Sequence, residues 1–155
     1  FQNELTPNLE AMLATAARYT LIHKTIYPAL SGGKIVLSDR SHLSMEVFQG
    51  WAGGPDPKLL ASLIYWSNAH IRPNLTVILD VPVEIAMARR AIDPKDKFES
   101  YGTDYLEKIR QGYLQLAHLY SGTCRVIDGA GSPDEVHNRV LETINQAFSW
   151  NLKAV

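Results

Sequence analysis

The chain has 155 residues, of which 46% are hydrophobic and 20% are charged, and its formal net charge is −1 at pH 7. This length and composition fit one globular domain, and the near-neutral charge excludes a bulk attraction to nucleic acid or to an anionic membrane. The single cysteine, Cys124, excludes an intrachain disulfide, and no apolar run approaches the roughly 20 residues that span a membrane. Because no signal-peptide pattern opens the chain, we expect a cytoplasmic protein.

The first part of the chain predicts a long helix followed by a short strand. Thr6-Pro7 has the residues preferred at an N-cap and at the first helical position. Apolar residues then recur at helical spacing until Gly32-Gly33, which predicts a helix over about 7–30. Residues 35–39 (IVLSD) predict a short buried strand.

The remaining elements alternate between helix and strand. Residues 75–80 (LTVILD) are almost continuously apolar, as in a strand covered on both faces. Three buried strands alternating with helices predict an α/β sandwich of three layers with a parallel sheet, whose carboxyl ends carry Asp39, Asp80 and Asp128. The other expected elements are helices around 43–50, 58–70, 82–91, 101–120 and 133–148, a polar connector at 92–97 and a strand at 124–128.

Asp39 and Arg40 come directly after the first predicted strand. Ligands of open α/β sheets bind outside the carboxyl ends of the strands. An aspartate there can bind Mg²⁺ or its waters, and an arginine can bind phosphate oxygens bidentately. Residues 44–49 follow with hydroxyl, aromatic and amide side chains at helical spacing, which suits contact with a nucleobase. The alternative interpretation of this segment alone is a surface ion pair that closes a strand.

Residues 39–50 (DRSHLSMEVFQG) resemble the thymidylate kinase family, whose bacterial members read DR-[YH]-x-x-S-x-x-A-[YF]-Q-G. The resemblance continues in order through RPNLTVILDVP at 72–82, ARR and DKFE within 88–99, and GYLQLA and VID within 112–128. It implies a P-loop nucleoside monophosphate kinase-like fold in a single domain over 1–155. It further implies ATP-dependent phosphorylation of dTMP to dTDP for dTTP biosynthesis, with Mg²⁺ as cofactor.

The resemblance also implies roles for individual residues. Arg18, in AAR, is expected to donate to thymine O4, and Phe48 to block a ribose 2′-hydroxyl. Arg40 is expected to bind the acceptor phosphate, and Asp39 to lie on the magnesium side. The expected substrate-binding residues are Arg18, Arg40, Ser44, Phe48 and Gln49, and the expected catalytic residues are Asp39, Arg40 and Arg90.

Four cations surround the connector that corresponds to the family's lid, at about 91–97. A mobile lid supplies positive charge to the migrating phosphoryl group while excluding water. The expected lid and ATP-phosphate residues are Arg89, Arg90, Lys95 and Lys97. A homodimer formed through the first helix is also implied, with Thr20, Ile26 and Tyr27 as contact residues.

The sequence departs from the family in its first portion. Phosphoryl transfer in this family needs a loop G-x-x-x-x-G-K-[ST], and the only Gly-Lys here, Gly33-Lys34, has neither the spacing nor the hydroxyl residue. We therefore expect this chain alone to be inactive, with fewer strands than the family. Ala14 and Ser41 replace a stacking Phe and a Tyr or His, which leaves open a kinase for another deoxynucleotide or deoxynucleoside. A non-catalytic nucleotide-binding module is the other alternative.

Overall fold

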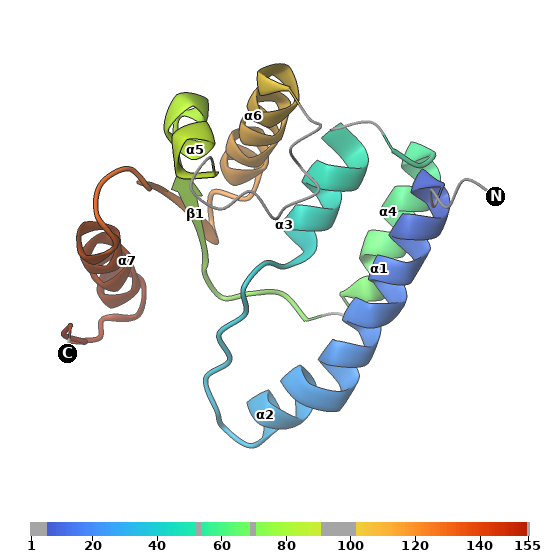
Figure 1. Cartoon of the computed structure of the whole chain (residues 1–155). Helices are drawn as coiled ribbons and strands as arrows, with labels where there is room; N and C mark the ends of the chain where they lie inside the picture. The colour runs from blue at the N-terminus through green and yellow to red at the C-terminus, as the bar shows by residue number, and fades with distance from the viewer. Residues whose placement is uncertain (1–5, 52–53, 69–70, 91–101, 155) are drawn as a thin grey trace. The chain divides into compact units, whose positions relative to one another are not determined.

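The computed structural model describes residues 6–51, 54–68, 71–90 and 102–154, and Figure 1 traces the chain. The chain divides into two compact units, Phe1–Arg72 and Pro73–Val155. In the described part of the chain, no helix is both long enough and apolar enough to cross a membrane. The predicted lid at 91–97 lies outside the described residues.

The regular elements of the first unit are all helical among its described residues, and α1 lies beside α4 (Figure 1). Its predicted helices are confirmed, although two stretches are wound as π-helix. In chain order the elements are α1 (Pro7–Leu21), the π-helical η1 (Ile22–Ile26), α2 (Tyr27–Ser31), α3 (His42–Met45), the π-helical η2 (Glu46–Trp51) and α4 (Pro57–Ser67).

Local sequence signals set the limits of the first helical segment. The Thr6 hydroxyl accepts a hydrogen bond from the backbone N–H of Leu9 at 3.4 Å, as expected of an N-cap. The π-helical stretch η1 precedes Pro28, which has no N–H to donate and whose ring crowds the carbonyl four residues earlier. Gly33, with a φ of 72°, ends the segment where the sequence predicts.

The predicted strand at 35–39 is wrong. Residues 34–38 form no strand, and the side chains of Ile35 and Leu37 are 76% and 94% exposed. In the described part of the chain, the only strands are two that pair with each other. A β-strand needs a partner for its N–H and C=O groups, and hydrophobic residues alone do not supply one. Asp39 and Arg40 therefore end an unpaired segment rather than a strand.

Fewer residues of α1 are buried in the core of the first unit than its apolar pattern predicts. Ala11 and Thr15 are buried on the side where α4 packs. The larger side chains of Leu9, Met12 and Leu13 are 43%, 46% and 52% exposed. The main apolar stripe of this helix thus remains largely open to solvent in the chain as described.

The second unit contains two of the three predicted strands, which pair as a parallel sheet packed with helices. The two strands run parallel in a register that pairs Asp80 with Asp128, so two of the three predicted carboxyl ends meet at one sheet edge. α6 packs against both strands, and α7 packs against the second. In chain order the elements are β1 (Thr76–Asp80), α5 (Val83–Arg90), α6 (Thr103–Leu119), β2 (Cys124–Asp128) and α7 (Pro133–Phe148).

The end of the second strand leads into a well-capped helix. The Ser132 hydroxyl accepts a hydrogen bond from the backbone N–H of Glu135, and the Glu135 carboxylate accepts one from the backbone N–H of Ser132. This reciprocal capping box satisfies two N–H groups that the helix leaves open. Cys124, at the start of β2, is buried, as its apolar neighbours predict.

Candidate nucleotide site

Arg40 is held in an unusual backbone conformation with its side chain over an aromatic ring. Its φ is 64°, in the left-handed region that non-glycine residues rarely adopt. The Ser38 hydroxyl donates a hydrogen bond to the Arg40 carbonyl oxygen at 2.9 Å. The guanidinium carbon lies 5.3 Å from the centre of the Phe48 ring, within the range of a cation–π contact. The structure thus brings together two of the predicted substrate-binding residues.

The turn after Arg40 is anchored by apolar side chains that alternate with the predicted polar ones. Leu43 and Val47 are buried in the first unit, 2% and 0% exposed. Ser44, Phe48 and Gln49, all predicted to face the substrate, are half-buried at the rim of the same helical segment. The buried residues therefore fix α3 and η2 in place, and π-helical turns of this kind occur frequently at functional sites.

Arg18 is bound to Asn68, which the sequence did not single out. Both Nε and Nη2 of Arg18 donate hydrogen bonds to the Asn68 side-chain oxygen, at 3.3 and 3.2 Å. These bonds connect α1 to the residue that follows α4. Burial and, secondarily, the nearby positive charge of Arg72 lower the pKa of the Arg18 guanidinium from its ordinary value. Arg18 is thus an anchored and partly desolvated cation.

His42 lies in the same electrostatic environment. Its side chain is buried, 6% exposed. Burial, followed by the charges of Arg72 and Arg18, lowers the pKa of His42 to about 4. The imidazole is therefore neutral near pH 7, which keeps a third positive charge out of this cluster. No sequence pattern predicted this, because the charges come from positions distant along the chain.

Asp39 is the residue from which the sequence predicts a contact with Mg²⁺. No group of three His, Cys, Asp or Glu side chains among the described residues could hold a metal ion. Asp39 offers a single exposed carboxylate. Phosphate-transfer sites usually bind Mg²⁺ through one or two carboxylates together with substrate phosphates and waters. Asp39 fits that role as one ligand, and a nucleotide would have to supply the others.

In the second unit an ion pair occupies the carboxyl end of β1. Arg110 donates from Nε and Nη2 to the two carboxylate oxygens of Asp80, at 2.7 and 2.9 Å. This bidentate pair lowers the pKa of the Asp80 carboxyl and raises that of the Arg110 guanidinium. Asp80 is therefore bound to α6, a partner that no sequence pattern indicated.

Arg89 contacts the loop that follows β2. Its Nη1 and Nη2 donate to the carbonyl oxygens of Gly129 and Gly131, at 3.1 and 3.0 Å. Arg139 also donates to a carbonyl of this segment, that of Asp128, at 2.8 Å. Two arginines thus fix this turn. Of the other predicted lid residues, Lys95 and Lys97 lie outside the described residues, as does the side chain of Arg90.

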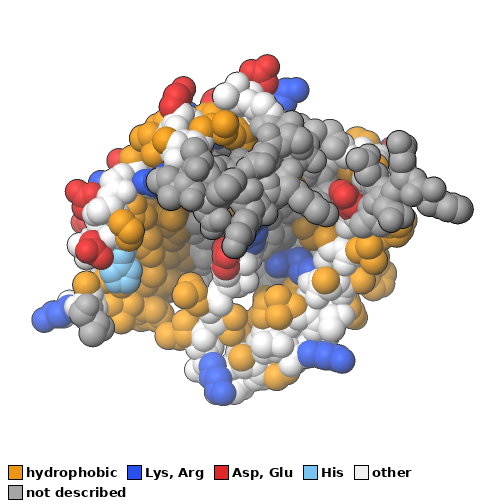
Figure 2. All heavy atoms as spheres, in the orientation of Figure 1, with side chains coloured by type: hydrophobic (Ala, Val, Ile, Leu, Met, Phe, Trp, Pro, Cys, Tyr) orange, Lys and Arg blue, Asp and Glu red, His pale blue; other side chains and the backbone are white. Residues whose placement is uncertain are grey.

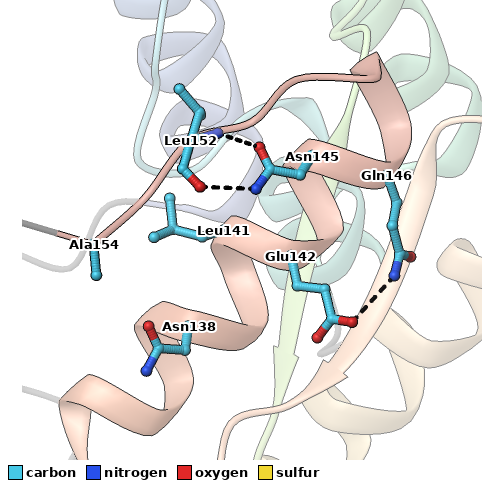
Figure 3. A pocket seen from close by; sticks show the side chains of 7 residues that line it. All are labelled: Asn138, Leu141, Glu142, Asn145, Gln146, Leu152 and Ala154. Atoms are coloured by element: carbon cyan, nitrogen blue, oxygen red, sulfur yellow. Dashed lines mark hydrogen bonds between the residues drawn. The ribbon is translucent and has the colours of Figure 1, made fainter.

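A shallow groove lies elsewhere in the second unit, between α7 and the chain end that folds back on it (Figure 3). It measures about 530 Å³, and Asn145 in its wall is bonded to both the N–H and the C=O of Leu152, at 2.8 and 3.0 Å. None of the predicted site residues lines it. The side chains of Asn145, Gln146 and Glu142 in its wall are engaged in hydrogen bonds within the groove, so the chemistry favours the Arg18 and Arg40 region as the site.

A protein-family model described as thymidylate kinase matches residues 1–140. Proteins named thymidylate kinase are similar over most of the chain. That of Symbiobacterium thermophilum is 35% identical over 139 residues, which cover 90% of this chain and 65% of the relative. The corresponding protein of Kosmotoga olearia is 35% identical, with coverages of 90% and 67%, and that of Desulforudis audaxviator is 38% identical, with coverages of 81% and 57%. The chain spans about two thirds of these relatives' length or less.

Proposed function

The chain belongs to the thymidylate kinase family, and from this membership we propose that the protein transfers the γ-phosphoryl group of ATP to dTMP, which gives dTDP and ADP. The observation that carries the proposal is the position of the Arg40 guanidinium over the Phe48 ring. A strained backbone at a ligand-binding arginine is a frequent feature of functional sites.

The first unit supplies the acceptor site in this proposal. Arg40 binds the dTMP phosphate bidentately, and Arg18 donates to the O4 carbonyl of thymine. Ser44 and Gln49 contact the base from the rim of the α3–η2 segment. Phe48 fills the space beside the sugar, where it leaves no room for a 2′-hydroxyl. This arrangement selects a deoxynucleotide with a keto-pyrimidine base.

The proposed reaction is a direct in-line transfer. An oxygen of the dTMP phosphate attacks the γ-phosphorus, the bond to the β-phosphate oxygen breaks, and ADP leaves, so no covalent enzyme intermediate is needed. Asp39 would hold Mg²⁺, which when bound neutralises charge on the phosphates. The positive charges of Arg40 and of the lid residues Arg90, Lys95 and Lys97 stabilise the transferring group.

We include Arg89 in the proposed lid in a positioning role. Its guanidinium binds the loop carbonyls of Gly129 and Gly131, which ties the end of α5 to the loop after β2. The lid itself is proposed at about 91–97.

We propose that residues 1–155 belong to a single kinase-like domain, a three-layer α/β sandwich with a parallel sheet. We also propose a homodimer formed through the first helical segment, including Thr20, Ile26 and Tyr27. The exposed side chains of Leu9, Met12 and Leu13 add an apolar contact surface to that helix. Figure 2 shows apolar side chains, in orange, over the part of the surface where α1 runs. We also propose a cytoplasmic location, which fits a chain whose single cysteine, Cys124, is buried.

The direct test is a phosphoryl-transfer assay with the protein in its full natural length. The protein is incubated with ATP, Mg²⁺ and one of dTMP, dCMP, dGMP or thymidine, and the products are separated by ion-exchange chromatography. We expect dTDP and ADP in equal amounts, with far less product from the other acceptors. Preferential phosphorylation of thymidine or dCMP, or transfer to no nucleotide while dTMP fails to bind, would contradict the proposal.

A further inference from the structure

We infer that Asn68 is a positioning residue that fixes the Arg18 guanidinium as a donor for the carbonyl oxygen of a keto-pyrimidine, and so contributes to the choice between dTMP and dCMP. The inference rests on the proposed function. Asn68 lies outside the motif at residues 39–50 that carries the resemblance to the family. The basis of the inference is the fork in which Nε and Nη2 of Arg18 share the Asn68 side-chain oxygen, at 3.3 and 3.2 Å.

The orientation of the Asn68 amide follows from the chemistry of its partner. A guanidinium has five N–H donors and no acceptor, so the amide oxygen and not the amide nitrogen must face Arg18. The nitrogen Nδ2 consequently points away from Arg18. It is buried, in a residue 1% exposed, and it has no hydrogen-bond partner among the described residues. A buried donor without an acceptor is uncommon in folded proteins, and a bound water or ligand would satisfy it.

The position of Asn68 makes it a rigid support. Its backbone N–H donates to the carbonyl of Ile64 at 3.2 Å, which ties the residue to the last turn of α4. The adjacent Ser67 is fully buried, and its hydroxyl donates to the same carbonyl at 3.0 Å. Arg18 stands in the last turn of α1, so the fork joins the ends of two packed helices. A long arginine side chain is thereby confined to one orientation.

The remaining N–H groups of Arg18 are available to a ligand. Nη1 and one N–H of Nη2 are not used by Asn68, and no carboxylate of the described residues forms an ion pair with Arg18. Arg72 adds positive charge nearby, and His42 is neutral near pH 7. The cluster therefore offers hydrogen-bond donors and positive charge, which match a carbonyl oxygen.

Such a set of donors discriminates between a keto and an amino group. Thymine presents an acceptor oxygen at position 4, whereas cytosine presents an amino donor there. When a buried donor meets another donor, both groups lose their hydrogen bonds, and a site built to bond its ligand rejects that analogue strongly. Discrimination requires that the guanidinium cannot swing away. Fixing the guanidinium is the contribution that we assign to Asn68.

The test compares dTMP and dCMP binding by isothermal calorimetry in the full protein and in three variants. Asn68→Ala removes the fork, and we expect dTMP binding to weaken roughly tenfold while dCMP binding changes little, so that the preference falls. Asn68→Asp retains an acceptor for Nε and Nη2, and should retain most of the preference. Ser67→Ala is the matched control, because it perturbs the same helix end without touching Arg18. It should lower the melting temperature and leave the preference unchanged.

The outcomes separate this inference from the proposed function. An unaltered preference in Asn68→Ala, or equal losses in Asn68→Ala and Ser67→Ala, would overturn the positioning role while the wild-type preference for dTMP still supported the kinase. Wild-type protein that binds the two nucleotides equally would contradict the proposed function, and the inference with it. If Asn68→Ala does not fold, Arg18→Lys replaces it, because lysine cannot form the fork. Retained preference in Arg18→Lys, or lost preference in Asn68→Asp, would then overturn the inference.

Discussion

Arg40 and His42 lie two residues apart, and each has an unusual property. The backbone of Arg40 is left-handed, and the pKa of His42 is strongly lowered. Arg40 has a left-handed backbone, which costs an L-residue roughly 1–2 kcal/mol. His42 is buried beside two arginines, which holds its imidazole neutral. Both conditions persist only because the surrounding residues impose them, in particular the buried side chains of Leu43 and Val47.

The lowered pKa of His42 predicts a specific dependence of stability on pH. The pKa is about 4 in the folded protein and about 6.5 in the unfolded chain, so between these values the unfolded chain binds a proton that the folded protein does not. The stability contributed by neutral His42 is therefore complete above about pH 6.5 and is lost as the pH falls to about 4. The loss can reach about 3 kcal/mol.

Urea unfolding at a series of pH values measures this effect. His42→Gln should remove most of the slope between pH 6.5 and 4 that the wild-type protein shows. His137→Gln, which changes an exposed histidine on α7, should leave the slope in place. Identical slopes in wild-type and His42→Gln protein would mean that His42 is not held neutral by its surroundings.

Among the elements, the turn after β2 depends on close contact with the end of β1. A side-chain carbon at Gly129 would lie 2.7 Å from Cγ2 of Val81 and 3.1 Å from Cβ of Leu79. We predict that Gly129→Ala lowers the free energy of unfolding by about 1–3 kcal/mol, because the loop must move away from the strand. Gly122→Ala is the control, since nothing lies within 4 Å of the carbon it adds.

Chemical denaturation of both variants makes this comparison. Gly122→Ala should stay within about 0.5 kcal/mol of the wild-type value. Equal stability of the two variants would contradict the contact at Gly129. A loss confined to Gly129→Ala would also reduce the proposed ATP-side function, because Arg89 binds the carbonyl of that glycine.

The elements that the sequence predicted correctly are those with local signals. The strand at 124–128 and the helix at 133–148 have the predicted limits, and the capping pair Ser132 and Glu135 marks the start of that helix. The strand predicted at 35–39 failed because strand formation depends on a pairing partner, which hydrophobic residues alone do not specify. The π-helical stretch before Pro28 was not predicted either, because the spacing of apolar residues was compared only with that of an ordinary α-helix.

The roles of the motif residues in the candidate site stay predictions, and the structure adds supporting contacts that the sequence did not indicate. Arg40 and Phe48 were expected to serve one site, and the structure brings them into contact. Asn68 was missed because it lies 50 residues from Arg18 along the chain and belongs to no local pattern. The pair formed by Asp80 and Arg110, 30 residues apart, was missed for the same reason. Supporting contacts of this kind arise from packing between elements, which a motif does not encode.

At the scale of the whole molecule, the proposed homodimer depends on the open stripe of α1. We predict that Leu13→Glu, which places a charge at a side chain that is 52% exposed, converts the dimer to a monomer with little change in the protomer's secondary structure. Leu119→Glu on α6, at a leucine 70% exposed, is the matched control and should remain dimeric. Sedimentation velocity at micromolar concentration distinguishes these outcomes. A monomeric wild-type protein would contradict the proposed homodimer.

We propose that this protein binds dTMP through a phosphate clamp at Arg40. Calorimetric titration of wild-type, Arg40→Ala and Arg40→Lys protein with dTMP and with thymidine, at fixed ionic strength, tests it most directly. Loss of a charge-assisted interaction worth about 1.5–3 kcal/mol should weaken dTMP binding by roughly ten- to a hundred-fold in Arg40→Ala. Arg40→Lys should recover part of that loss, because a point charge cannot form two parallel bonds. Thymidine has no phosphate, so its affinity should change far less. Equal losses for dTMP and thymidine would contradict the clamp.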